Sequence, residues 1–144
     1  MYMQLRMVLL LLALQMGSSG FAQPAPSWTR EQLMEPAELA ARLQSGKNLP
    51  TILSVGPGAY IPHSTDIGMV SEKENLEKLR NQLKPLARDT PVVIYCGCCP
   101  FAHCPNVGPA IQVLKDLKFT RFKLLNLEHN IRVDWIAKGY PVAR

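Results

Sequence analysis

The sequence lacks several features that would assign the protein to a particular structural or functional class. After residue 22 it contains no long hydrophobic run, no run of basic residues and no internal repeat. Sixteen Lys and Arg against eleven Asp and Glu give a formal net charge of +5, and the basic residues are spread among acidic ones. The chain lacks the basic stripe that is typical of nucleic-acid-binding proteins, so we expect no nucleic acid among its partners.

Cysteine is absent everywhere except in one short segment. The four cysteines are Cys96, Cys98, Cys99 and Cys104. An exported domain ordinarily uses cysteines to link distant segments by disulfides. Here any bridge would close only a very small loop, and the stabilisation from a disulfide grows with the loop that it closes. We therefore expect these cysteines to serve chemistry or metal binding.

The beginning of the chain resembles an export signal. Arg6 is followed by the apolar run 7–16, and the small residues Gly20 and Ala22 suit a cleavage site near Ala22. The run is shorter than the roughly 20 residues that cross a bilayer, so we expect no permanent membrane anchor. The predicted organisation is a signal peptide over 1–22, a leader over 23–35 and one domain over 36–144, located in the periplasm or secreted.

Strand-like and helical patterns alternate along the remaining chain. Pro36 and Gly46 frame a first helix, and the segment that begins Ser71-Glu72-Lys73-Glu74 matches a capping box at the start of a second. The segment 59–70 reads as irregular. The predicted helices are 36–45, 71–84, 106–118 and 128–138, and the predicted strands are 51–55, 91–95 and 121–126. This alternation predicts an α/β fold with a mainly parallel central sheet and helices on both faces.

Cys96 follows the strand 91–95, whose unbroken apolar character is typical of a central parallel strand. Ligands bind at the carboxyl ends of such strands. Backbone N–H groups in a loop there, with the N-terminus of the next helix, form a nest that favours an anion. We therefore expect Cys96 to react as a thiolate nucleophile, with Asn106 as the N-cap of the following helix.

Two segments resemble rhodaneses. Pro91 to Cys96 is similar to the rhodanese strand that delivers the catalytic cysteine, and Asp134 to Val142 is similar to the tryptophan followed by Gly-Tyr-Pro-Val that closes many of these domains. The resemblance implies a rhodanese-like fold and a sulfurtransferase that carries a persulfide on Cys96, with a small sulfur donor and a thiol acceptor as partners and no cofactor. The implied persulfide-binding and anion-binding loop comprises Gly97, Cys98, Cys99, Pro100, Phe101 and Ala102.

The sequence also departs from that family. Ser54-Val55-Gly56 stands where many rhodaneses have an Asp-x-Arg pair, and residues 97–105 contain no Lys or Arg. Rhodaneses that use thiosulfate, and phosphatases with a similar loop, rely on a basic residue at this position. The absence argues against both thiosulfate as the donor and phosphatase activity.

The additional thiols leave two alternatives open. Cys96 and Cys99 form a C-x-x-C pair that suits a thiol-disulfide redox protein, and Cys98, Cys99 or Cys104 would serve as a resolving thiol. The second alternative is a metal-binding module in which Cys96, Cys98, Cys99, His103 and Cys104 bind Cu(I), or less favourably Zn(II). We interpret His63 as a surface residue, and Trp135 and Tyr140 as packing residues.

Overall fold

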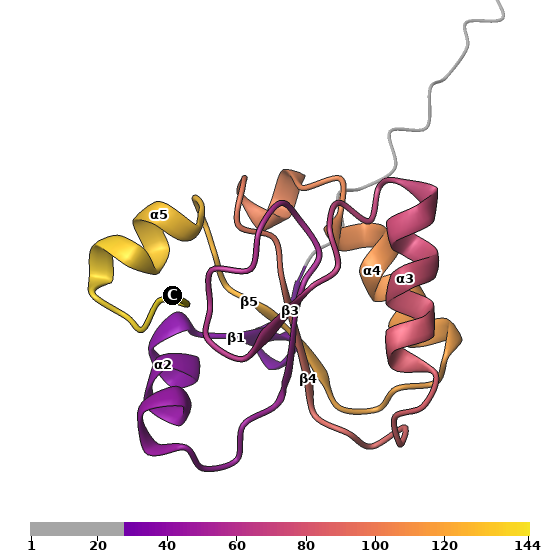
Figure 1. Ribbon diagram of the computed structural model, residues 1–144, viewed down its shortest axis with the longest axis horizontal. Helices are drawn as coiled ribbons and strands as arrows, with labels where there is room; N and C mark the ends of the chain where they lie inside the picture. Colours follow the sequence, from indigo (N-terminus) through magenta and orange to yellow (C-terminus); the bar gives the residue numbers. More distant parts are fainter. Residues whose placement is uncertain (1–27) are drawn as a thin grey trace, which may run out of the picture.

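The structure is a computed structural model that describes residues 28–144. The predicted signal peptide and the first residues of the predicted leader lie outside this range. A five-stranded sheet forms the centre of the molecule, with the strand order β1-β5-β4-β2-β3 and every pairing parallel (Figure 1). The strands are β1 (Leu33–Met34), β2 (Thr51–Ser54), β3 (Ser64–Asp66), β4 (Val92–Tyr95) and β5 (Phe122–Leu125).

Helices cover both faces of this sheet. The α-helices are α2 (Pro36–Ser45), α3 (Lys73–Leu83), α4 (Val107–Asp116) and α5 (Ile131–Asp134), and three 3₁₀ helices are η1 (Arg30–Gln32), η2 (Phe101–His103) and η3 (Ile136–Lys138). The helices α3 and α4 lie on one side of the sheet and α2 and α5 on the other (Figure 1). The buried residues of α3 and α4 belong to one core cluster, and those of α2 and α5 belong to the other. The prediction of an α/β fold with a parallel sheet and helices on both faces is confirmed.

β4 is the strand that both cores use. Its residues alternate between the two clusters, with Val92 and Ile94 on the α3/α4 side and Val93 and Tyr95 on the α2/α5 side. All four are buried, which explains the unbroken apolar run in the sequence. The Tyr95 hydroxyl accepts a hydrogen bond from the backbone N–H of Ile61 at 3.3 Å, so this polar atom is satisfied inside the core.

Trp135 holds the end of the chain against the α2/α5 core. Its side chain is fully buried, its indole N–H donates to the carbonyl of Pro141 at 2.7 Å, and its ring packs edge-on against Tyr140 at 5.1 Å. The packing role predicted for both aromatic residues is confirmed. The predicted helix 128–138 is broken at Trp135, whose φ of −128° lies outside the helical region, and so becomes α5 and η3.

Several predicted boundaries differ from the structure. Leu33 and Met34, placed in the leader, form the edge strand β1 and pair with Leu124 and Leu125 of β5. The segment predicted to be irregular contains β3, which pairs with β2. The predicted capping box is wrong, since α3 begins at Lys73 with Glu72 as its N-cap and no side-chain cap.

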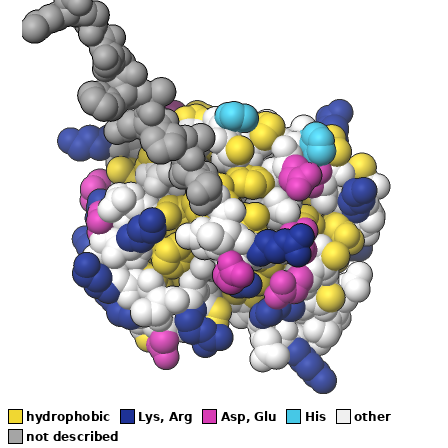
Figure 2. Space-filling view, turned by 180° about the vertical axis from the view of Figure 1, so that it is seen from behind, with side chains coloured by type: hydrophobic (Ala, Val, Ile, Leu, Met, Phe, Trp, Pro, Cys, Tyr) yellow, Lys and Arg dark blue, Asp and Glu magenta, His cyan; other side chains and the backbone are white. Residues whose placement is uncertain are grey.

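The surface of the described part shows no strong segregation of charge on the face in Figure 2, where Lys and Arg side chains are interleaved with Asp and Glu. Among residues 28–144, no helix is long and apolar enough to cross a membrane.

Candidate functional site

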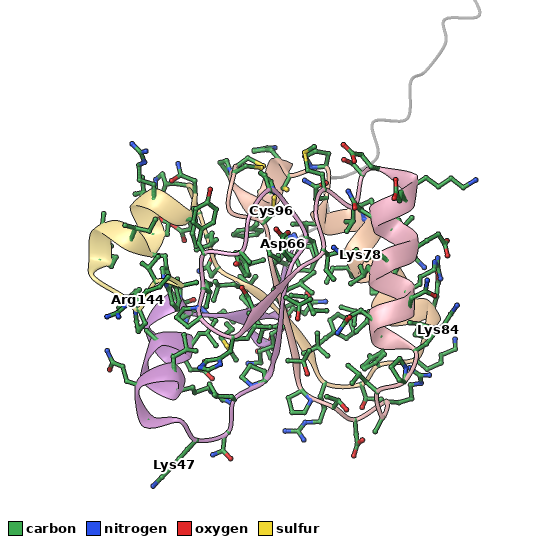
Figure 3. All side chains as sticks on the ribbon, in the orientation of Figure 1. Lys47, Asp66, Lys78, Lys84, Cys96 and Arg144 are labelled. Carbon is green, nitrogen blue, oxygen red and sulfur yellow. The ribbon has the colours of Figure 1, made fainter. Side chains whose placement is uncertain are left out.

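Cys96 lies directly after the carboxyl end of β4, on the α3/α4 side of the sheet (Figure 3). Its side chain is only 2% exposed. The loop that it opens is fastened to the other side of the sheet, because the carbonyl of Gly97 accepts the N–H of Ile131 at 2.9 Å and the N–H of Phe101 donates to the carbonyl of Leu127 at 3.3 Å. A Cβ on Gly97 would lie 3.1 Å from Ile131, so the loop passes close to α5.

The loop brings the four cysteine sulfurs together. The Sγ atoms of Cys96 and Cys98 are 3.4 Å apart, and those of Cys98 and Cys99 are 3.2 Å apart. Including Cys104, all four Sγ atoms lie within 4.8 Å of one another, and all four cysteines are free thiols. We call these four residues the cysteine cluster. The sequence predicted that they share a loop, and the structure adds that their sulfurs converge.

Exposure is graded across the cysteine cluster. Cys96 and Cys104 are buried, Cys99 is half-buried and Cys98 is exposed. A hydrogen bond with Cys96, together with burial, raises the pKa of Cys104, and burial is the largest cause of the raised pKa values of Cys98 and Cys99. These three residues therefore favour the thiol form at neutral pH, and Cys104 is suited to donate its S–H to the Cys96 sulfur.

Asn106 was predicted to cap a helix with its side chain, but in the structure this side chain contacts two of the thiols. It occupies the N-cap position of α4 but makes no cap with its side chain. Instead its Oδ1 accepts the N–H of Ser71 at 2.9 Å, and its Nδ2 donates to the sulfurs of Cys96 at 3.6 Å and Cys104 at 3.8 Å. Because the N–H of Ser71 can only donate, the amide orientation is fixed with Nδ2 toward the thiols.

Gly56 also lies against the Cys96 side chain. It follows β2 and is buried, and a Cβ at this position would collide with the Sγ of Cys96. The sequence Ser54-Val55-Gly56 therefore gives the Cys96 side chain the space that it occupies. The sequence analysis noted only that an ion pair is missing here.

The other predicted loop residues lie around the cysteine cluster. Phe101 is half-buried and packs edge-on against Trp28, with ring centroids 6.4 Å apart. Pro100, Ala102 and His103 are exposed. His103 does not belong to the group of converging ligand atoms, so the structure does not support its predicted place in a metal site.

Several backbone N–H groups of the loop make no hydrogen bond within the described residues. Within residues 28–144, no acceptor is hydrogen-bonded to the N–H of Gly97, Cys98, Cys99 or Ala102. The resemblance implied that loop N–H groups hold the persulfide and the donor anion. The fold leaves the hydrogen-bonding capacity of these four groups unused.

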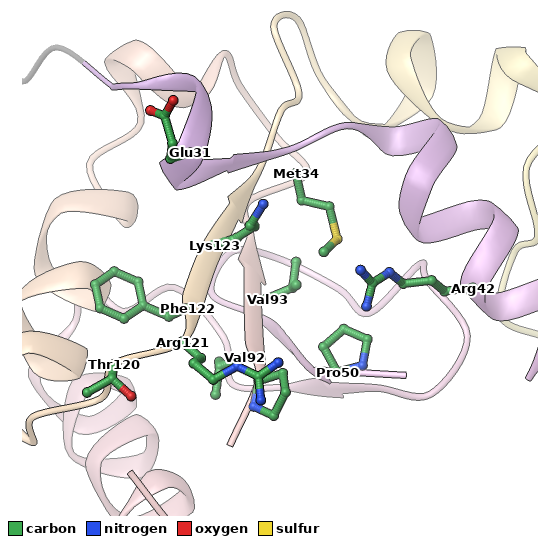
Figure 4. Close-up of a pocket in the computed structure, with 11 residues that line it drawn as sticks. Glu31, Met34, Arg42, Pro50, Val92, Val93, Thr120, Arg121, Phe122 and Lys123 are labelled. Carbon is green, nitrogen blue, oxygen red and sulfur yellow. The ribbon is translucent and has the colours of Figure 1, made fainter. Parts of the chain in front are cut away.

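A separate pocket of about 250 Å³ lies at the opposite end of the sheet (Figure 4). It is lined by the starts of β4 and β5, including Val92 and Phe122, and by charged side chains such as Arg42 and Lys123. No cysteine lines this pocket, and it lies at the amino ends of these strands, whereas Cys96 follows the carboxyl end of β4. We therefore place the candidate site at the cysteine cluster. His63, predicted at the surface, is indeed exposed.

Comparison with known proteins supports the architecture and names no function. No family model matches the chain, and no curated protein matches it in sequence. Among solved structures, the chain is similar to the BH2092 protein from Bacillus halodurans, with a TM-score of 0.57 and 19% sequence identity. The match covers 78% of this chain and 77% of that one. At this identity the likeness shows the fold alone.

Proposed function

We propose that the chain is an exported rhodanese-like sulfurtransferase that carries sulfane sulfur as a persulfide on Cys96. The observation that carries the proposal is the position of Cys96, a buried thiol at the carboxyl end of the central strand with a fixed N–H donor from Asn106. Ligand sites of open parallel sheets form at this end.

The reaction consists of two displacements at sulfur. The Cys96 thiolate attacks the sulfane sulfur of a donor, a new S–S bond forms, and the bond from that sulfur to the rest of the donor breaks with its electron pair. A thiolate acceptor then attacks the outer sulfur of the persulfide, and Cys96 leaves as a thiolate. The oxidation state of the protein is the same at the beginning and the end.

The loop favours one class of donor. Residues 97–105 contain neither Lys nor Arg, so a doubly charged donor such as thiosulfate would meet no cation on the loop. The loop N–H groups without an acceptor, which include those of Cys98 and Cys99, suit a donor or persulfide with a single charge. We therefore propose a low-molecular-weight persulfide or an organic polysulfide, each with at most one negative charge, as the donor, and a thiol as the acceptor.

The test uses reduced, metal-free protein under anaerobic conditions. The protein is incubated with an organic polysulfide, with a small-molecule persulfide and with thiosulfate, and intact mass and peptide mapping follow each addition. We expect the mass of one sulfur atom on Cys96 with the first two donors, none in Cys96→Ser, and full uptake in the exposed control His103→Ala. A wild-type protein without an adduct on Cys96 for every donor would contradict the proposal.

A thiol-disulfide redox function is the second candidate, and the spacing of the thiols favours it. The Sγ atoms of Cys96 and Cys98 lie 3.4 Å apart, so Cys98, one of the three resolving thiols that the sequence left open, is a direct neighbour of Cys96, whereas the C-x-x-C motif pairs Cys96 with Cys99. In this reaction the two thiols lose two electrons and two protons to a disulfide partner, which is reduced to a dithiol. A catalytic pair would have a reduction potential above about −300 mV. Thiols that stay free in an excess of oxidised glutathione would exclude this function.

A further inference from the structure

The cysteine cluster has the composition and the shape of a metal site. Its members come from one loop and one short segment beyond η2, yet their four Sγ atoms lie within 4.8 Å of one another. Sulfur transfer requires one of these thiols and a redox pair requires two. Neither function explains why all four point to the same place.

The spacing of the sulfurs suits a tetrahedral ion. A zinc ion bound by four cysteines has Zn–S bonds of about 2.3 Å, which places neighbouring sulfurs about 3.8 Å apart. The separations of 3.4 Å between the sulfurs of Cys96 and Cys98 and 3.2 Å between those of Cys98 and Cys99 are somewhat shorter than this value, and no two of the four sulfurs are more than 4.8 Å apart. Four sulfurs this close together are compatible with a single tetrahedral ion.

Asn106 has the geometry of an outer partner of such a site. It is 2% exposed, and its Nδ2 reaches the sulfurs of both buried cysteines, Cys96 and Cys104, while Ser71 fixes its other end. Groups that hydrogen-bond to metal ligands orient them and tune the ion. Since residues 97–105 carry no Lys or Arg, the loop itself supplies no cation to balance several thiolates. A divalent ion would offset two of the four negative charges.

We propose that Cys96, Cys98, Cys99 and Cys104 together bind one Zn²⁺ ion, and that Asn106 orients the two buried ligands. Cys98 is exposed and Cys99 half-buried, so the ion has an entry path on that side. Binding replaces the four thiol protons by the metal, so protons are released as the ion enters. The inference goes beyond the proposed sulfur transfer and shares Cys96 with it. A zinc-loaded chain therefore does not accept sulfane sulfur until the ion leaves.

The first experiment measures binding directly. Reduced full-length protein is stripped with a chelator under anaerobic conditions and titrated with Zn²⁺ against a chromophoric chelator, with native mass spectrometry for stoichiometry. Co²⁺ is the spectroscopic probe in a parallel titration. We expect one ion per chain and the intense absorption of tetrahedral cobalt bound to thiolates. Substoichiometric Zn²⁺ binding, an octahedral Co²⁺ spectrum, or uptake of Cu⁺ without Zn²⁺ would overturn the proposal.

Variants test the ligand set. Cys98→Ser changes an exposed side chain and is the variant least expected to disturb folding, and Cys104→Ser tests a buried ligand. Each should weaken zinc binding by more than the roughly 10–100-fold that the loss of an outer partner costs. His103→Ala is the matched control and should bind zinc as the wild type does. Cys98→Ser with wild-type affinity would overturn the four-cysteine assignment, whatever the behaviour of Cys104→Ser.

Asn106→Asp separates orientation from packing. The substitution keeps an oxygen for the N–H of Ser71 and replaces the Nδ2 donor, so the fold contact remains while the N–H···S bonds are lost. We expect zinc affinity to fall by about 10–100-fold and the Co²⁺ charge-transfer bands to shift. An unchanged affinity and an unchanged spectrum would show that Asn106 does not act on the ligands.

The proposed sulfur transfer and the proposed zinc site can be refuted independently of each other. Sulfur uptake is measured on the stripped protein and zinc binding without a sulfur donor. Zinc binding without sulfur uptake by the stripped protein would refute only the proposed transferase. Sulfur uptake without stoichiometric zinc would refute only the metal site. Equal sulfur uptake by zinc-loaded and stripped protein would refute the shared use of Cys96.

Discussion

Gly56→Ala is the substitution whose effect the structure defines most sharply. The backbone of Gly56 is not in the positive-φ region, so alanine is acceptable for the main chain. The obstacle is the Sγ of Cys96, with which the new Cβ would collide, while the Cα and Cβ of Cys96 lie at 3.5 Å, an ordinary contact. The conflict therefore involves one atom of one side chain.

The expected cost follows from the density of protein interiors. An added methyl group in a well-packed core typically destabilises a protein by about 1–3 kcal/mol. In a Cys96→Ala background the colliding sulfur is absent, and Gly56→Ala should then be nearly neutral. The coupling energy between the two positions should therefore be about 1–3 kcal/mol, within the range known for residues in contact.

The assay is urea unfolding of four reduced, metal-free proteins: wild type, Gly56→Ala, Cys96→Ala and the double variant. The coupling energy is the destabilisation that Gly56→Ala causes in the wild-type protein minus the destabilisation that it causes in Cys96→Ala. The comparison requires that the urea dependence of the unfolding free energy is alike in all four proteins. A cost of Gly56→Ala that is the same with and without the Cys96 sulfur would refute the reasoning. Gly56→Ala should also slow sulfur uptake by displacing the nucleophile.

Three further predictions concern the core and the last helix. Trp135→Ala should cost about 3–5 kcal/mol in chemical denaturation because a fully buried aromatic side chain is lost, and a cost below 1 kcal/mol would contradict this. Tyr95→Phe leaves the buried N–H of Ile61 without its acceptor and should cost about 1–3 kcal/mol in the same assay, so wild-type stability would count against it. Burial favours neutral Asp134, but hydrogen bonds from His129 outweigh it and lower the pKa of Asp134. The ionised Asp134 side chain therefore stabilises the fold at pH values above its pKa in the unfolded chain, about 3.9. This stabilisation is lost as the pH falls through the pKa of Asp134 in the folded chain. Asp134→Asn should flatten this acid limb in a series of unfolding curves, and an unchanged limb would refute the role of Asp134.

The sequence was most informative where one local pattern determined the structure. The unbroken apolar run of β4 predicted a central strand, and that strand determined the place of Cys96. Pro36 and Gly46 framed α2 correctly, because each sits where a helix tolerates or needs that residue type. These features depend on neighbours in the chain, so they are visible without a structure.

The features that were missed depend on distant contacts. β1 has two residues and β3 has three, too few for a periodic pattern, and each is a strand only because of the partner beside it. Asn106 looked like an ordinary N-cap because its partners, Ser71 and Cys96, are 35 and 10 residues away. The exclusion of His103 from the cysteine cluster likewise follows from the path of η2 and not from spacing.

The position of β1 has a consequence for the order of events during synthesis. This edge strand, at residues 33–34, pairs with residues 124–125 of β5, and β5 lies between β1 and β4. The first hundred residues of a growing chain therefore contain neither the neighbour of β1 nor one of the two neighbours of β4. The sheet, and with it the support beneath Cys96, is completed only after nearly the whole chain has been made.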